Sequence, residues 1–134
     1  MSTVSSKYLG DLRTECTHLQ SGTKLITDAP TDNQGKGEYF SPTDLVATAL
    51  GSCMVTIMGI SARQYGFDLE GLTWKVTKIM ADNPRRIGEI VVELDFHGNE
   101  YPDQHKRVIE HITRTCPVAL SLHPELKQRI KIIW

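Results

Sequence analysis

Two of the three cysteines in this chain stand where a thiol could carry out chemistry. Cys53 ends the segment Ala-Leu-Gly-Ser-Cys in the middle of a long apolar run, and Cys116 directly precedes Pro117. A free cysteine is either a small buried hydrophobe or a nucleophile whose reactivity depends on how readily the thiol loses its proton. The local sequence leaves both interpretations open for each residue.

The two thiols are expected to have different electrostatic surroundings. Pro117 opens a short helix, so Cys116 would cap its N-terminus, where backbone N–H groups and the positive end of the helix dipole favour a thiolate. Cys53 lies about three turns into its own helix, too far for the dipole to lower its pKa much. The sequence therefore predicts that Cys116 is the more acidic thiol and that a reactive Cys53 needs a cationic partner from elsewhere in the fold.

The helix that carries Cys53 has clear sequence signals at both ends. Ser41 can cap it, Pro42 suits its first position, and Asp44 stands three residues after the cap. Residues 45–65 are apolar nearly all round, which predicts burial on most sides, and Gly66 is a candidate for the C-terminal cap.

The same helix passes a first test for a membrane span. Residues 45–62 are uncharged and reach the lower edge of transmembrane length. Small and polar residues interrupt the run, Asp44 and Arg63 close it, and the flanking sequence has the pattern of a globular protein. We therefore expect a buried central helix and no membrane association.

The rest of the chain alternates between strands and helices. We expect a strand over 7–19, a turn at 20–22 and a returning strand over 23–27, then antiparallel strands over 73–81 and 87–96, helices over 102–115 and 117–123, and a final strand over 129–134. This order of elements predicts an α+β fold, with residues 1–134 forming one domain.

Composition narrows the functional classes. The chain has 134 residues, 40% apolar and 23% charged, with a net charge of -1 and a pI near 6.5, so no basic footprint for nucleic acid is visible. No secretory signal is recognisable, and an odd number of unpaired cysteines suits a reducing compartment, so we expect a cytoplasmic protein. No zinc-like cysteine spacing occurs, and we expect neither a metal nor a cofactor.

Other polar residues carry weaker signals of function. Cys16 and His18 should point to one face of the first strand, and we expect Cys16 to pack as a strand thiol because further metal ligands are missing. His105 and His123 are candidates to approach Cys116, although solvent or capping roles suit them better.

Two motifs resemble those of the OsmC/Ohr family. The stretch Ser-Pro-Thr-Asp-Leu-Val-Ala-Thr-Ala-Leu-Gly-Ser-Cys, residues 41–53, resembles the family's helix start followed by its reactive cysteine. Thr-Cys-Pro-Val, residues 115–118, resembles its second motif, in which a Cys-Pro pair ends one helix and opens the next. The Ser-Pro-x-(Asp/Glu)-Leu start is closest to the less characterised OsmC-like redox-protein branch.

The resemblance implies an OsmC-like fold, with antiparallel sheets wrapped around the long helix in an intertwined homodimer that holds two active sites at the subunit interface. It also implies a thiol peroxidase of oxidative stress defence. Cys53 would attack a small organic hydroperoxide or hydrogen peroxide and become a sulfenic acid, and Cys116 would resolve it as a disulfide that an external dithiol reduces.

One position departs from the family pattern and keeps other functions open. Thr43 stands where the family places a Glu that, with an Arg, activates the thiolate. Asp44 is expected to serve the helix start, and Arg13 and Glu38 are replacements by residue type only, a solvated strand charge being the favoured interpretation of Arg13. The alternative is a non-catalytic protein that binds or senses a small apolar or oxidised ligand at the dimer interface. A cysteine hydrolase is the weakest alternative, because no spacing places a base beside Cys53.

Overall fold

The structure is a computed structural model that describes all residues, 1–134. The chain divides into two compact units, residues 1–46 and 47–134, and each is described by itself. The prediction of a single domain stays a prediction.

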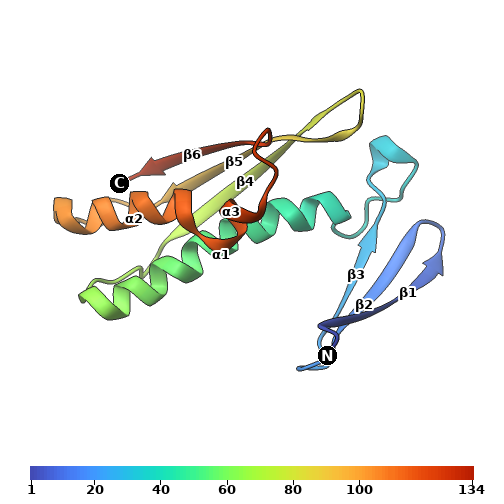
Figure 1. Cartoon of the computed structure of the whole chain (residues 1–134), viewed down its shortest axis with the longest axis horizontal. Helices are drawn as coiled ribbons and strands as arrows, with labels where there is room; N and C mark the ends of the chain where they lie inside the picture. Colours follow the sequence, from blue (N-terminus) through green and yellow to red (C-terminus); the bar gives the residue numbers. More distant parts are fainter. The chain divides into compact units, whose positions relative to one another are not determined.

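The N-terminal unit is built on an antiparallel three-stranded sheet in the order β1-β2-β3 (Figure 1). Its strands are β1 (Val4–Gly10), β2 (Arg13–His18) and β3 (Lys24–Asp28), and a single 3₁₀ turn, η1 (Thr31–Asn33), follows them. The turn expected at 20–22 joins β2 to β3, and the returning strand lies within one residue of its predicted bounds.

The single strand predicted over 7–19 is wrong, because the chain reverses direction inside that segment. Asp11 and Leu12 both adopt the left-handed backbone region, with φ of 54° and 62°, and they join β1 to β2. Such turns usually contain Gly, Asn or Asp at both central positions. A leucine there breaks the sequence rule, and the turn was therefore missed.

The N-terminal unit has almost no apolar core. The side chains of β1 are exposed along nearly the whole strand, and the buried residues near the end of β3, Thr27 and Asp28, are polar. A sheet of three strands needs an apolar face against another element for independent stability. The residues of this unit therefore give its sheet little apolar packing.

Helix α1 (Pro42–Tyr65) starts and ends as predicted. The backbone N–H of Asp44 donates to Ser41 Oγ at 3.1 Å, and the N–H of Ser41 donates to Asp44 Oδ2 at 2.9 Å, which is a reciprocal capping box. At the other end Gly66 has a φ of 74°, and its N–H donates to the carbonyl of Ala62. The glycine supplies the left-handed conformation that ends the helix.

The C-terminal unit places helices against one sheet of three strands (Figure 1). Its elements after α1 are β4 (Thr73–Ala81), β5 (Arg86–Asp95), α2 (Asp103–Thr115), α3 (Pro117–Ser121) and β6 (Lys127–Ile133). The α+β class is confirmed. The strands β4 and β5 are antiparallel as predicted, but β6 pairs with β5 in the parallel sense, because α2 and α3 carry the chain back to the starting end of β5.

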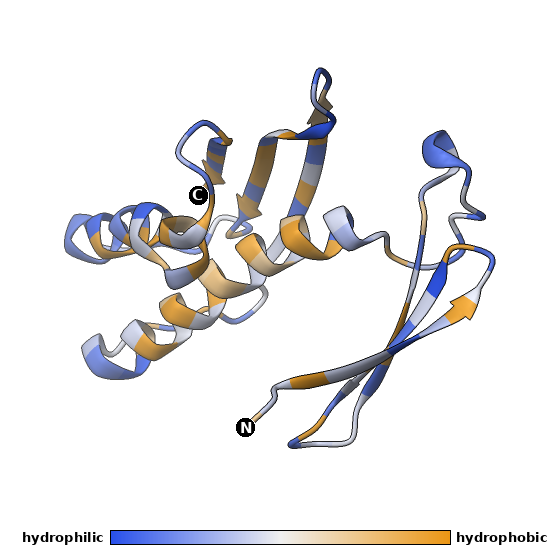
Figure 2. Ribbon diagram, turned by 45° about the vertical axis from the view of Figure 1, so that its right-hand side comes forward, coloured by the Kyte–Doolittle hydropathy of each residue, from blue (hydrophilic) through white to orange (hydrophobic).

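The core of this unit lies between the sheet and the helices. The alternation predicted for β5 is confirmed, since Ile90, Val92, Leu94 and Phe96 are fully buried. They pack with apolar residues of α1 and α2, namely Leu50, Met54, Met58, Ile109 and Ile112. Figure 2 shows the same alternation of apolar and polar residues along the strands. Each large side chain buried in this way contributes roughly 1.5–3 kcal/mol relative to exposure.

Gly51 fixes how closely α1 approaches the sheet. A Cβ atom at this position would lie 2.9 Å from Nε1 of Trp74 and 3.0 Å from Cγ2 of Val76, both on β4. Real Cβ atoms rarely make such short contacts, so a side chain here would force the helix or the side chains of Trp74 and Val76 to shift. The missing side chain sets the depth of the helix turn that carries Cys53.

The other side of α1 is uncovered, contrary to the burial predicted on most sides. Val46 and Ile60 are 37% and 51% exposed, and the small residues Ala49 and Ser52 are also exposed. By length and composition alone α1 is the one helix that could cross a membrane, and a core helix meets the same criteria. The apolar pattern of α1 thus exceeds what packing within this unit buries.

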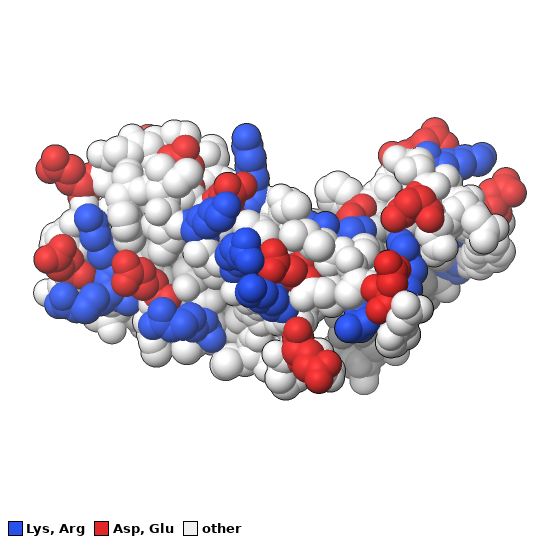
Figure 3. Space-filling view, turned by 90° about the horizontal axis from the view of Figure 1, so that it is seen from above, with Lys and Arg blue, Asp and Glu red and all other residues white.

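Charged side chains of both signs are mixed on the face of the molecule shown in Figure 3. On the outer face of the C-terminal sheet, Glu89 pairs with Lys127 at 3.9 Å, and Glu93 pairs with Lys131 at 3.9 Å. This face is a solvated ladder of opposite charges.

Candidate active site

Cys53 lies near the middle of α1, two residues after the close contact at Gly51. Its side chain is half-buried and packs against the core cluster of the C-terminal unit. The capping box at the start of α1 and the contact of Gly51 with Trp74 together set the rotation and depth of the helix, so they also set where this thiol points.

Cys116 occupies the junction between α2 and α3, as predicted. It ends α2 through a hydrogen bond from its N–H to the carbonyl of Ile112, and its Sγ accepts a hydrogen bond from the N–H of Ala119 at 3.4 Å. Pro117 takes the first position of α3, where its missing N–H costs nothing. The thiol is fully buried.

The expectation that Cys116 is the more acidic thiol misjudged the dominant effect. Burial raises the pKa of the Cys116 thiol above its ordinary value, and the hydrogen bond from Ala119 lowers it by less. A hydrogen bond with Cys53 and the proximity of that second thiol raise the pKa further. Loss of water around a buried thiolate therefore outweighs the cap of a helix only five residues long.

The structure brings the two cysteines together. They come from segments far apart in the chain, yet the thiol of Cys53 lies close enough to raise the pKa of the Cys116 thiol, and both cysteines are free. Cys53 is the more accessible of the two, and Cys116 lies behind it in the core. Such a pair can receive an oxidant at the outer sulfur and then close a disulfide with the inner one.

Arg13 belongs to a carboxylate cluster in the N-terminal unit and is not a solvated strand charge. Its guanidinium donates from Nε to Asp28 Oδ1 at 2.7 Å and from Nη2 to Asp28 Oδ2 at 2.9 Å. Nη2 also donates to Glu38 Oε1 at 3.0 Å, and the guanidinium lies 4.8 Å from the centre of the Tyr39 ring. The sequence indicated Arg13 and Glu38 only by residue type, without relating them. In the structure they form an ion pair.

Asp28 is the member of this cluster that the sequence reasoning missed. Its side chain is buried, and the Arg13 guanidinium holds its pKa below the usual range, against the opposing effect of burial. The N–H of Glu38 also donates to it at 3.1 Å. A signal was present: once the hairpin turn at 20–22 is accepted, its register places Arg13 directly opposite Asp28.

Thr43 and Asp44 serve the start of α1. The Thr43 hydroxyl lies 3.2 Å from Ser41 Oγ, and the Asp44 carboxylate accepts the N–H of Ser41. The role expected for Asp44 is confirmed.

The remaining candidate site residues either lie away from the two thiols or make only local contacts. Cys16 is half-buried in β2, 3.8 Å from the Thr14 hydroxyl. His123 is exposed and accepts the N–H of Glu125 at 3.0 Å, a local turn contact. His105 lies in the first turn of α2, whereas Cys116 follows the last, so it does not approach that thiol. No group of three or more His, Cys, Asp or Glu side chains is placed to hold a metal ion.

Comparison with known proteins identifies the family. Residues 35–131 match the model of the OsmC-like protein family, a match that covers most of the chain. The chain therefore belongs to the OsmC/Ohr family, and the resemblance found in its two cysteine motifs is confirmed. No curated protein matches the sequence.

Solved structures agree with this assignment. A protein from Psychrobacter arcticus 273-4, whose name refers to osmotic stress induction and a detoxification response, is 51% identical, with a TM-score of 0.93 over 98% of this chain and 96% of that one. The organic hydroperoxide resistance protein OsmC of Legionella pneumophila is 14% identical, with a TM-score of 0.78 over 100% and 98% of the two chains. An organic hydroperoxide resistance protein from Elizabethkingia anophelis is 11% identical, with a TM-score of 0.72 over 99% and 96%. The two distant structures show the shared fold.

The Arg13–Asp28 pair predicts a pH-dependent stability. Because the pKa of Asp28 is lowered in the folded protein, its contribution is fully present above the unfolded value of about 4 and is lost as the pH falls through the folded value. Asp28→Asn should therefore lower the thermal midpoint at pH 7, and the gap to wild type should narrow between pH 4 and pH 2.

Circular dichroism melts at several pH values measure this gap. Asp11→Asn, at an exposed turn position of the same unit, is the matched control and should change little. A gap between wild type and Asp28→Asn that stays constant down to pH 2 would contradict the assignment.

Proposed function

We propose that this protein is a thiol peroxidase that reduces a small organic hydroperoxide or hydrogen peroxide through Cys53 and Cys116. The observation that carries the proposal is the contact between a half-buried thiol and a fully buried one in the C-terminal unit. Membership of the OsmC/Ohr family and the likeness to organic hydroperoxide resistance proteins support a peroxide-related redox function.

In the first step the Cys53 thiolate attacks the outer oxygen of the hydroperoxide. A sulfur–oxygen bond forms, the O–O bond breaks, and the leaving alkoxide takes a proton and departs as an alcohol, or as water from hydrogen peroxide. Cys53 becomes a sulfenic acid, oxidised by two electrons, and the peroxide is reduced by the same two. Cys53 suits this role because it is the more accessible of the two thiols.

In the second step the Cys116 sulfur attacks the sulfenic sulfur of Cys53. A disulfide forms and the sulfenic oxygen leaves as water, carrying the Cys116 proton. The raised pKa of Cys116 disfavours its thiolate, so this thiol is a poorer nucleophile toward peroxide than an unperturbed one. Its Sγ is already held in place by Ala119, which limits the movement needed to close the bond.

An external dithiol completes the cycle by thiol–disulfide exchange. One of its sulfurs attacks the disulfide, forming a mixed disulfide, and its second sulfur displaces the remaining protein thiol. A cytoplasmic protein would meet such reductants, and we propose that location. The cycle involves no nucleic acid, membrane or cofactor.

We also propose that the chain acts as a homodimer. One side of α1 is uncovered, with Val46 and Ile60 exposed beside small residues that allow close helix packing. The N-terminal unit exposes further large apolar side chains, namely Val4, Tyr8, Leu9, Leu12, Leu19, Leu25, Tyr39 and Phe40. Exposed apolar surface on this scale is typical of a face that a partner covers, and a second copy supplies a matching surface.

The peroxidase proposal predicts a loss of turnover in Cys53→Ser. Consumption of cumene hydroperoxide with dithiothreitol or dihydrolipoamide should fall by roughly a hundredfold or more, because the nucleophile is gone. Cys16→Ser is the matched control, a cysteine in the other unit, and it should keep the wild-type rate. Equal rates in wild type and Cys53→Ser would sink the proposal.

The alternative is a non-catalytic protein that binds or senses a small apolar or oxidised ligand at the dimer interface. The observation in its favour is Thr43, which occupies the family's Glu position and serves the helix start. The two functions differ in what a brief exposure to peroxide does to the thiols.

Peptide mapping after such an exposure distinguishes them. With one equivalent of hydroperoxide for a few seconds, the peroxidase should give a Cys53–Cys116 disulfide, and Cys16 should remain free. Unchanged thiols together with a bound apolar molecule in native mass spectrometry would favour the binding protein. Cys116→Ala should accumulate the Cys53 sulfenic acid, which dimedone traps.

The dimer proposal predicts a mass twice that of the 15.0 kDa chain in light scattering after gel filtration. Ile60→Glu should shift the protein toward the monomer, because it places a charge in an apolar interface. Gln104→Glu, on the exposed side of α2, is the control and should leave the mass unchanged. A wild-type mass of 15.0 kDa at micromolar concentration would contradict the dimer.

A further inference from the structure

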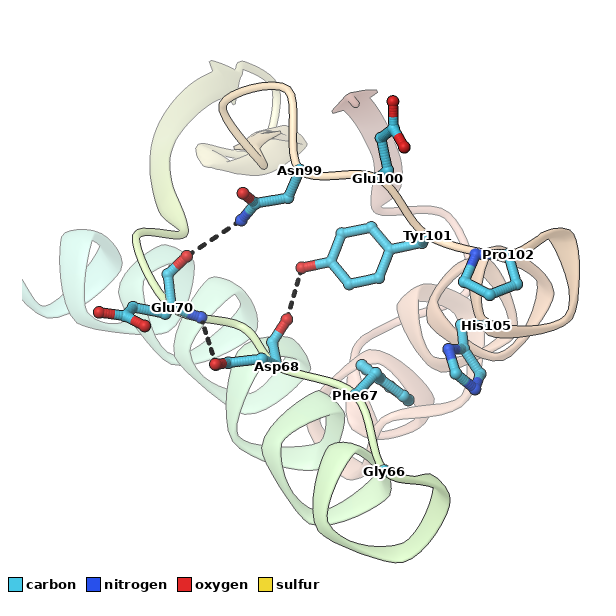
Figure 4. A pocket seen from close by; sticks show the side chains of 9 residues that line it. All are labelled: Gly66, Phe67, Asp68, Glu70, Asn99, Glu100, Tyr101, Pro102 and His105. Atoms are coloured by element: carbon cyan, nitrogen blue, oxygen red, sulfur yellow. Dashed lines mark hydrogen bonds between the residues drawn. The ribbon is translucent and has the colours of Figure 1, made fainter.

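The C-terminal unit contains a cavity that the proposed redox chemistry does not use. It lies between the segment that follows α1 and the segment that leads from β5 into α2, and its volume is about 580 Å³ (Figure 4). Pockets of this size hold small organic molecules. His105, on its wall, and Cys116 lie at opposite ends of α2, roughly 16 Å apart along the helix axis. The cavity is therefore separate from the thiol pair.

Hydrogen bonds between the two segments hold this cavity open. The Tyr101 hydroxyl donates to the carbonyl of Asp68 at 2.6 Å, and the Asn99 side chain donates to the carbonyl of Glu70 at 3.1 Å. The N–H of Glu70 donates to the Asp68 carboxylate at 2.8 Å, which fixes the loop itself. Figure 4 shows the bonds of Tyr101 and Asn99 bridging the two sides and the Glu70–Asp68 bond within one of them. The site is thus formed before any ligand arrives.

Aromatic rings make one wall. Phe67 meets Tyr101 edge-to-face at 6.1 Å between ring centres and lies 4.7 Å from the His105 ring. Tyr101 in turn contacts Phe96 at 5.4 Å, so the wall continues into the core and is rigid. The faces of such rings attract cations.

The charge of the lining has one sign. Asp68, Glu70 and Glu100 contribute carboxylates, and neither Lys nor Arg lines the cavity. Burial raises the pKa of the Tyr101 hydroxyl, the hydrogen bond with Asn99 opposes this, and the negative charge of Asp68 adds a smaller increase. A positively charged ligand would gain from every carboxylate at the rim, whereas an anion would be repelled.

A buried polar atom in the same wall lacks a partner. Nδ1 of His105 is buried and has no hydrogen-bond partner in the protein, although the ring lines the cavity. Unsatisfied buried polar atoms are uncommon because each is costly. This atom is closed off from the cavity, so the carboxylates and the aromatic rings, and not this nitrogen, are the groups that a ligand would meet.

We propose that this cavity binds a small organic cation, an amine in its protonated form attached to an aromatic or aliphatic body. The ammonium group lies at the rim, where Asp68 and Glu70 contribute negative charge on one side and Glu100 on the other, and the body packs on Phe67 and Tyr101. This binding does not depend on the peroxidase chemistry, so the two proposals stand or fall separately.

A series of ligands with one ring and different charge tests the proposal on the full chain. Phenethylammonium, the neutral 2-phenylethanol and the anionic 3-phenylpropionate are titrated into ¹⁵N-labelled protein, and the amide shifts of residues 66–70 and 99–105 are followed. Phenethylammonium should bind several-fold more tightly than the alcohol, and the anion least tightly. Raising the salt concentration should weaken the cation alone.

Charge variants locate the site. Glu70→Gln and Glu100→Gln should each weaken phenethylammonium about two- to fivefold, the size of a solvent-exposed ion pair, and should not affect the alcohol. Glu110→Gln, an exposed carboxylate elsewhere on α2, is the matched control and should change nothing. Equal affinity for the cation and the alcohol, or equal losses in Glu100→Gln and Glu110→Gln, would overturn the proposal.

Discussion

The close approach of α1 to β4 is the constraint on which the C-terminal unit depends. Gly51 permits it, because any side chain there would collide with Trp74 and Val76. With the helix at that depth, Leu50, Met54 and Met58 fill the space above the sheet, and Cys53 on the next turn reaches toward the α2–α3 junction. A helix displaced outward would loosen the core contacts and move Cys53 away from Cys116. The depth of α1 therefore governs both the packing of the core and the approach of Cys53 to Cys116.

The two thiols show how burial divides roles between identical side chains. Cys116 lies at a helix N-terminus, which favours a thiolate, yet desolvation raises its pKa. This thiol therefore suits the second step of the proposed reaction better than the first. Cys53 has no helix terminus to help it but is the one that an oxidant can reach. The depth at which each thiol is buried, more than the helix dipole, decides which of the two reacts first in the proposed reaction.

The N-terminal unit is organised around charge instead of apolar packing. Its buried centre is the Asp28 carboxylate, which accepts two hydrogen bonds from Arg13 and one from the backbone of Glu38. A buried carboxylate is tolerated only with such full pairing, and the pair joins β2 to the end of β3. Its large apolar side chains are exposed, as is one side of α1, and these exposed surfaces are the ground for the proposed homodimer.

The sequence by itself determined the elements whose signals are local. The capping box at Ser41, the stop at Gly66, the alternation along β5 and the junction at Cys116 each follow from neighbouring residues, and the two cysteine motifs identified the family. The turn at Leu12 and the parallel pairing of β6 escaped it, the first because leucine rarely adopts a positive φ and the second because strand direction depends on distant segments.

Only the tertiary structure decided which residues meet and how deeply they lie. Three features depend on segments that are distant in the sequence, so no local pattern predicts them. They are the approach of Cys53 to Cys116, the pairing of Arg13 with Asp28 and the exposed face of α1. The pKa of Cys116 is the clearest case, since the local helix signal and the surrounding burial act in opposite directions. Burial is a property of the whole packed unit, and its cost for a thiolate exceeds what one short helix supplies.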